Sequence, residues 1–130
     1  ITGIPGHPVE TVTVENIKIL YPGRGNNGLA NIPLSRLDDV PEKESAYPEF
    51  SMFGELPAWG FYVRHVDGLV LKDVMIGIKA PDYRPAMVFD DVHQVTSQST
   101  IIKGDRKPKT IILHHTDKVV MDNEESILKM

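Results

Sequence analysis

The nine residues Val9-Glu-Thr-Val-Thr-Val-Glu-Asn-Ile17 return in pattern as Val66-Asp-Gly-Leu-Val-Leu-Lys-Asp-Val74. In each copy apolar residues alternate, two polar residues interrupt, and alternation resumes in the opposite parity. Alternation of period two is typical of a half-buried β-strand. The inward residues would be Val12, Val14, Ile17 and Ile19, then Leu69, Leu71, Val74, Ile76 and Ile78. The parity change indicates a bend after which the same side still faces inward, which predicts a β-solenoid.

Two weaker copies of the pattern follow, around residues 92–99 and 116–123. The four copies align on a polar residue at the bend. These residues are Asn16, Asp73, Ser99 and Asn123, separated by 57, 26 and 24 residues. Asn and Asp suit bends because they tolerate the left-handed backbone region, and spacings of about 25 residues are typical of solenoid repeats. Polar residues at bends occur in any β protein, but together with the apolar register they favour an all-β parallel β-helix.

The alignment divides the chain into one domain of about four coils with one long inserted loop. The coils span residues 1–20, 60–83, 84–106 and 107–130, and the inserted loop spans residues 21–59. Residue 1 aligns with a position inside a coil, without an amphipathic cap of the kind that solenoids need. We therefore expect the C-terminal part of a longer β-helix, whose uncapped first coil favours a homo-oligomer.

Composition limits the classes of partner. The 130 residues carry a formal net charge of −4, which argues against non-specific binding of nucleic acid. The one basic cluster, residues 103–109, is short and is interpreted as a solvated turn. No apolar run approaches the roughly 20 residues of a membrane span, so no membrane association is expected. The chain shows no signal peptide, and the absence of cysteine leaves its compartment open.

The second half of the inserted loop, residues 47–59, is rich in aromatic and apolar groups that must pack on something. One interpretation places Tyr47, Glu49 or Trp59 in a sugar-binding groove, where aromatic faces and carboxylates contact a sugar ring and its hydroxyls. The alternative is that the aromatic residues only hold the loop down. Arg64 and His65, in the strand after the loop, could also face such a groove or form a solvated pair on the outer wall.

Three segments carry a resemblance to a known family. Residues 1–10, residues 40–66 except 45–46, and residues 84–92 look like the C-terminal region of bacterial polygalacturonase-like proteins of glycoside hydrolase family 28. The similarity covers most of the chain and thins out after about residue 95. It implies a right-handed parallel β-helix, a pectic oligosaccharide or polysaccharide as substrate of the parent enzyme, and a periplasmic or secreted location.

The catalytic motifs of that family do not appear where it would place them. Its Asn-Thr-Asp, Gly-His-Gly and Arg-Ile-Lys motifs are absent, Asp90-Asp91 lies downstream of its catalytic pair, and Asp38-Asp39 lies in the inserted loop. No catalytic residue is carried over, so the chain alone is expected to be inactive. The competing class is a non-catalytic carbohydrate-binding or self-associating module. Basic residues are expected to bind a polyanionic substrate, and the candidates are Arg24, Arg36, Arg64 and Arg84.

The histidines show no metal-binding spacing. There are five of them and no cysteine, and no two stand at the helical spacing of a zinc site. Asp90, Asp91 and His93 could gather around a cation, but neighbours on a strand point to opposite faces, so at most two would converge. We therefore expect neither a metal nor a cofactor.

Overall fold

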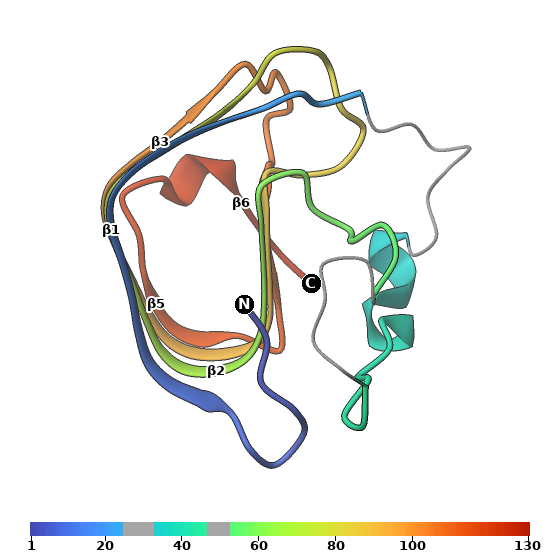
Figure 1. Cartoon of the computed structure of the whole chain (residues 1–130). Coiled ribbons are helices and arrows are strands. Elements are labelled where there is room, and N and C mark those ends of the chain that lie inside the picture. The colour runs from blue at the N-terminus through green and yellow to red at the C-terminus, as the bar shows by residue number, and fades with distance from the viewer. Residues whose placement is uncertain (25–32, 47–52) are drawn as a thin grey trace.

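The computed structural model describes residues 1–24, 33–46 and 53–130, and this part of the chain is all-β (Figure 1). The strands are β1 (Val9–Tyr21), β2 (Phe61–Ile78), β3 (Met87–Lys103), β4 (Ile111–His114), β5 (Asp117–Val120) and β6 (Ile127–Lys129). The described residues also form two short 3-10 helices, η2 (Leu34–Asp39) in the inserted loop and η3 (Glu124–Ser126) before β6. None of the helices among the described residues is long and apolar enough for a membrane span.

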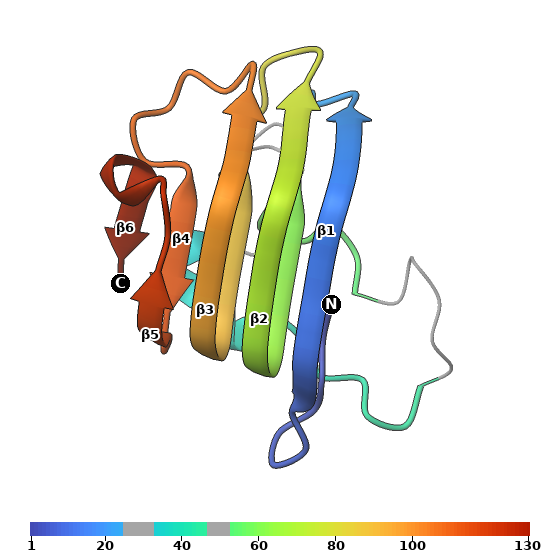
Figure 2. The ribbon, with the colours of Figure 1, turned by 90° about the vertical axis from the view of Figure 1, so that its left-hand side faces the viewer.

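All pairings among these six strands are parallel. The sheet runs in the order β1-β2-β3-β4-β6, and β5 also pairs with β3. The three long strands are bent, lie one above another and curve around a common interior (Figures 1 and 2). The three short strands lie in the segment that was expected to form the last coil.

The predicted register of the bends is confirmed in three of four positions. Asn16, Asp73 and Ser99 lie at the same level of neighbouring strands, and their φ angles of 55°, 52° and 58° are in the left-handed region. Asn123 was placed wrongly in this series. Its φ is −111° because it precedes η3, and its side-chain amide donates a hydrogen bond of 2.9 Å to the carbonyl oxygen of Thr100.

Two further corners recur in the stack and were missed by the sequence analysis. Residues with positive φ at the same level are His65, Asp91 and His115 at one corner, and Thr11, Gly68, Gln94 and Lys118 at the next. Their varied side chains leave no compositional signal. At each such residue the strand alternation is broken, so two consecutive side chains can reach the same surface.

The core fills the interior between the walls. Its members with no exposed surface are Val63, Val66, Leu69, Leu71, Val74, Ile76, Ala86, Met87, Phe89, Val92, Val95 and Ile111. The inward residues predicted in β2 are therefore confirmed. Those predicted in β1 are only half-buried, because β1 is the edge strand and pairs with β2 alone among the described strands.

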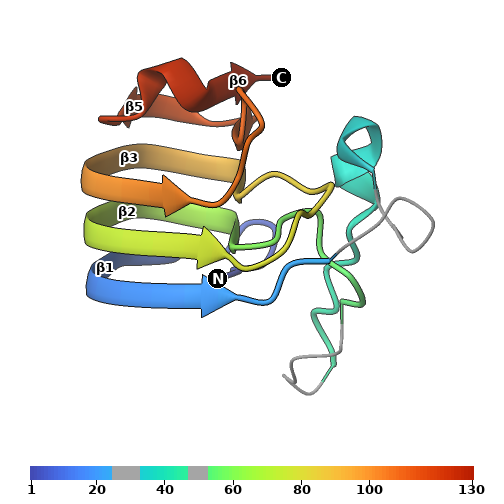
Figure 3. The same ribbon diagram turned by 90° about the horizontal axis from the view of Figure 1, so that it is seen from above.

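A second apolar cluster fastens the inserted loop to the outside of the stack. Tyr62, Val88 and Ile112 point outward at one level of β2, β3 and β4, and Leu37 and Val40 from the loop cover them. Figure 3 shows the described parts of the loop beside this face of the stack. Helix η2 was not expected, since six residues of the loop carry no clear helical period.

A glycine just after β3 tests how closely this turn approaches the end of β2. Gly104 has φ +82°, and a Cβ there would lie 2.4 Å from the carbonyl oxygen of Ile78. We expect Gly104→Ala to lower the free energy of unfolding by about 3 kcal/mol through strain and collision. Gly6→Ala is the matched control, because Gly6 has φ +76° but no described neighbour within 4 Å of such a Cβ. If urea denaturation gave the two variants equal losses of unfolding free energy, the close contact between Gly104 and Ile78 would not be the cause.

Candidate functional site

A charged ladder runs across the outer wall, next to the second apolar cluster. Arg64, Asp90 and His114 lie at one level of β2, β3 and β4. Arg64 Nε lies 3.0 Å from Asp90 Oδ2 as an ion pair, and His114 Nδ1 lies 2.8 Å from Asp90 Oδ1. The Asp90 side chain is only 2% exposed, so its negative charge is offset by these two partners and not by water.

The inserted loop adds a second carboxylate to the ladder. Glu42 lies 3.0 Å from both Arg64 Nη1 and His65 Nε2, and Arg64 Nη1 donates a 2.7 Å hydrogen bond to the carbonyl of Val40. Arg64 and His65 are 7% and 8% exposed, so the expectation of a solvated pair is wrong. The positive φ of His65 brings both consecutive side chains within reach of Glu42.

A chain of imidazole and carboxylate contacts continues from His65. Asp91 Oδ2 lies 2.6 Å from His65 Nδ1, and Asp91 Oδ1 lies 3.2 Å from His93 Nε2. His93 Nδ1 in turn lies 3.0 Å from Asp117 Oδ1. Asp90 instead contacts Arg64 and His114. As expected, only Asp91 and His93 of the triplet at residues 90, 91 and 93 meet.

These contacts shift the titration of the groups involved. Burial would lower the pKa of His65, but hydrogen bonds to Asp91 and Glu42 outweigh it and raise that pKa. The hydrogen bond to Asp117 raises the pKa of His93. Burial would raise the pKa of Asp91, yet its two imidazole partners hold it below the ordinary value. The network is thus strongest with protonated imidazoles and an ionised Asp91.

Stability is expected to be greatest in weakly acidic solution. Raised histidine pKa values stabilise the fold fully below the unfolded pKa of about 6.5 and lose that effect as pH rises through the folded values. The lowered pKa of Asp91 stabilises above about 3.9 and is lost as pH falls through its folded value. The urea midpoint should therefore decrease as the pH is raised from about 6 to about 8. His93→Gln should flatten that fall relative to the exposed control His7→Gln, and an unchanged slope would contradict the assignment.

Of the three predicted loop residues, only Trp59 falls in the described part of the chain. Its side chain is 4% exposed and belongs to the core. Its indole N–H donates a 2.9 Å hydrogen bond to Asp105 Oδ2, and its ring packs edge-on against Tyr21 at 5.6 Å. Trp59 therefore has no free face for a sugar and holds its segment in place. Tyr47 and Glu49 lie outside the described residues.

A second feature, called here the basic hollow, lies where the chain leaves β2 and β3, at the opposite ends of these strands from the charged ladder. Residues 78–82 and 104–108 line a cavity of about 740 Å³. Lys79 and Arg106 are exposed there. Lys107 Nζ instead lies 2.7 Å from Asp105 Oδ1 and donates to the carbonyl of Asp82. The turn interpreted as merely solvated thus forms one side of a recess with two available cations.

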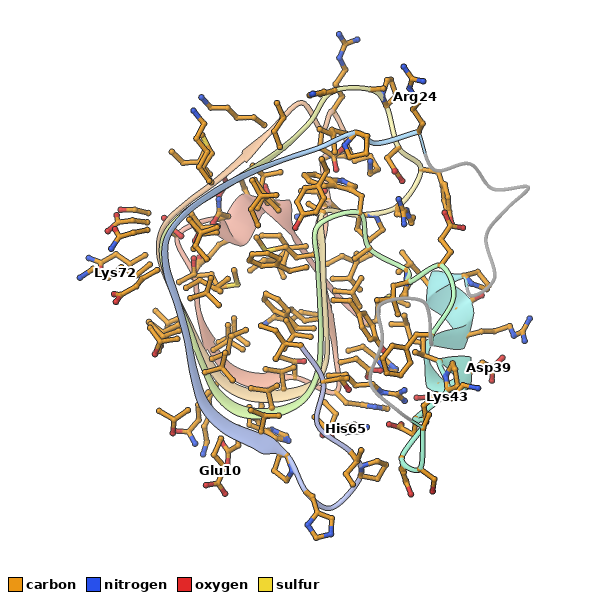
Figure 4. The ribbon with its side chains drawn as sticks, viewed as in Figure 1. Glu10, Arg24, Asp39, Lys43, His65 and Lys72 are labelled. Carbon is orange, nitrogen blue, oxygen red and sulfur yellow. The ribbon has the colours of Figure 1, made fainter. Side chains whose placement is uncertain are left out.

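The four candidate arginines differ in their ion-pair partners. Arg36 pairs with Asp39, Arg64 lies in the charged ladder, and Arg84 pairs with a carboxylate at residue 82 at 2.8 Å. Arg24 is exposed, and its side chain has no partner within residues 1–24, 33–46 and 53–130; its backbone N–H donates to the carbonyl of residue 81 beside the hollow. Figure 4, which looks along the stack, shows Arg24 near the top of the view and His65 near the bottom.

A further group of ligand-type side chains was missed by the sequence analysis. Asp38, Asp90, His114 and His115 each offer one donor atom, and these atoms lie within 4.8 Å of one another. The strand pairing brings residues 90 and 114 together, and the inserted loop adds Asp38. The expectation that no metal site exists rested on spacing along the chain, which does not register such an approach.

Comparison with family models, curated proteins and solved structures found no match to this chain. The family resemblance thus depends on the quoted segments alone.

Proposed function

We propose that this chain is part of a right-handed parallel β-helix of the polygalacturonase type and binds a pectic polyanion. The observation that carries the proposal is the stack of bent parallel strands whose bends recur at the same level. Such in-register recurrence is what each coil of a solenoid needs in order to bury its neighbour. The resemblance adds the substrate class, and with it a periplasmic or secreted location.

The basic hollow is the part of the chain that best suits such a substrate. Galacturonic acid units carry carboxylates, which guanidinium and ammonium groups bind by charge-assisted hydrogen bonds. Lys79 and Arg106 line the recess and Arg24 is bonded through its backbone to residue 81 at its rim. Within the described residues none of the three has a carboxylate partner of the kind that Arg36, Arg64 and Arg84 have. The hydrolytic acid and base are assigned to residues of a parent enzyme, so binding without cleavage is expected.

Calorimetric titration with oligogalacturonides, with reducing-sugar release followed in the same samples, tests this proposal. We expect binding without release. The double variant Lys79→Ala/Arg106→Ala should weaken binding about fivefold, whereas Arg36→Ala, which removes an arginine outside the hollow, should leave it unchanged. Absence of binding would overturn the substrate-contacting role. Release of reducing ends would show that the chain contains an acid and a base after all.

A second candidate function, self-association, is favoured by the edge of the sheet at β1. Val14, Ile17 and Ile19 line an apolar hollow of about 360 Å³ together with residues 1, 56, 58 and 60–63. The outer backbone edge of β1 has no paired strand among the described residues, and such edges favour strand addition. Sedimentation should show a fraction of dimer that increases with protein concentration. Ile17→Lys should abolish the dimer, whereas Val120→Lys, at the end of the stack away from β1, should keep it. A monomer at all concentrations would exclude this function.

A further inference from the structure

We propose that Asp38, Asp90, His114 and His115 form a binding site for a divalent transition-metal ion, with Zn²⁺ as the best match. Their four donor atoms already lie within 4.8 Å of one another. A tetrahedral zinc site with bonds of about 2.0–2.2 Å places its ligand atoms about 3.4 Å apart. Small rotations of the exposed side chains of Asp38 and His115 can supply that contraction.

The two consecutive histidines share a surface because of the backbone. His115 has φ 47°, the left-handed value of its corner, so the alternation of strand side chains is broken there. The two rings lie 3.9 Å apart between centroids at an angle of 34°. His114 and His115 can therefore present nitrogens to the same ion, which a regular strand would prevent.

Asp90 provides the buried side of the site. Its side chain is almost wholly buried, and its Oδ2 accepts no hydrogen bond from the described residues, although Arg64 lies 3.0 Å away as an ion pair. Buried carboxylate oxygens are normally hydrogen-bonded. A cation at the mouth of the ladder would satisfy the carboxylate, while Arg64 would hold it in the orientation needed for binding.

Asp38 is held in place by its neighbour. Leu37, one residue before it in η2, is 2% exposed and packs in the second apolar cluster on the outer wall. Asp38 is thereby carried to the level of His114 although it comes from a distant part of the chain. A bound ion would connect the inserted loop to β3 and β4, which the loop otherwise contacts through that cluster and the charged ladder.

The donor set selects the class of ion. Imidazole nitrogens suit Zn²⁺ and its transition-metal neighbours, whereas Mg²⁺ and Ca²⁺ prefer oxygen donors alone. Four protein ligands leave no open position at a tetrahedral ion, which is typical of a structural zinc site. This inference does not depend on pectin binding, since its residues lie away from the basic hollow.

Titration of the tag-free, chelator-treated chain with ZnCl₂ by calorimetry tests the site. We expect one Zn²⁺ per chain and no competition from equimolar Mg²⁺. His115→Ala and Asp38→Asn should each weaken binding by at least about tenfold, the lower end of the loss caused by removing even an outer-shell partner. Both side chains are exposed, so the variants should keep the far-ultraviolet circular dichroism of the parent chain.

Two matched controls and a second measurement sharpen the result. His7→Ala and Asp39→Asn remove a histidine and a carboxylate outside the site and should bind Zn²⁺ as the parent does. Zn²⁺ should also raise the thermal midpoint of the parent chain, because it binds the folded state, but not that of His115→Ala. Absence of binding at millimolar ZnCl₂, unchanged affinity in both site variants, or equal competition by Mg²⁺ would overturn the proposal.

Discussion

Phe89→Ala is expected to lower the free energy of unfolding by about 4 kcal/mol. Phe89 has no exposed surface and is the largest of the fully buried side chains among the described residues. It lies at one level with Val63 in β2 and Leu113 in β4, so the loss would leave a cavity in the middle of three neighbouring strands. Urea denaturation followed by circular dichroism measures the change. A domain of this size has about 5–15 kcal/mol in total, so the variant should be close to unfolding at 37 °C.

Two controls separate the cavity from the loss of apolar character. Phe89→Leu keeps most of the volume and should cost less than about 2 kcal/mol. Ile101→Ala removes a side chain that is 49% exposed and should change stability by less than about 0.5 kcal/mol. If Phe89→Ala lost no more than Ile101→Ala, this region would not be the packed centre of the fold.

Arg64→Met is expected to cost about 4 kcal/mol of unfolding free energy, because it leaves buried Asp90 without its cationic partner. The guanidinium also ties the inserted loop to the wall through Glu42 and the carbonyl of Val40. Arg36→Met is the matched control, since Arg36 makes its ion pair with Asp39 at the surface. Surface pairs contribute little to stability, so that variant should resemble the parent chain.

A double replacement separates the unpaired charge from the lost contacts of the arginine. Arg64→Met/Asp90→Leu removes both charges and should recover a large part of the loss of Arg64→Met, as replacement of whole buried pairs does elsewhere. The measurements are made with chelator present, so that a metal bound at Asp90 does not contribute. A double variant as unstable as the single one would show that the contacts to the loop carry the effect.

The left-handed corners connect the fold with its chemistry. A bend residue such as His65 or His115 places two consecutive side chains on one surface, and the parallel pairing repeats the arrangement on the next strand. The outer wall therefore gathers charged groups from three strands in a small area. The inserted loop covers this area and contributes Asp38 and Glu42 to it.

The register of the stack could be read from the residues alone. Parity of the apolar residues decides which side chains of a strand face inward, and the predicted inward residues Leu69, Leu71 and Val74 have no exposed surface. The polar residues at one bend could be aligned for the same reason. The other two corners could not, because residues as different as Thr11, Gly68 and Gln94 occupy one of them.

Sequence by itself determined the all-β class, the inward face of β2 and the level at which Asn16, Asp73 and Ser99 meet, since each follows from local periodicity. Only the tertiary structure showed which residues come together in the charged ladder and in the group of metal-ligand side chains. Neighbouring parallel strands lie about 4.8 Å apart, so Asp90 and His114 touch although 24 residues separate them. The docking of the inserted loop depends on scattered apolar contacts without a period. No pattern along the chain therefore indicated that Asp38 would reach the two histidines.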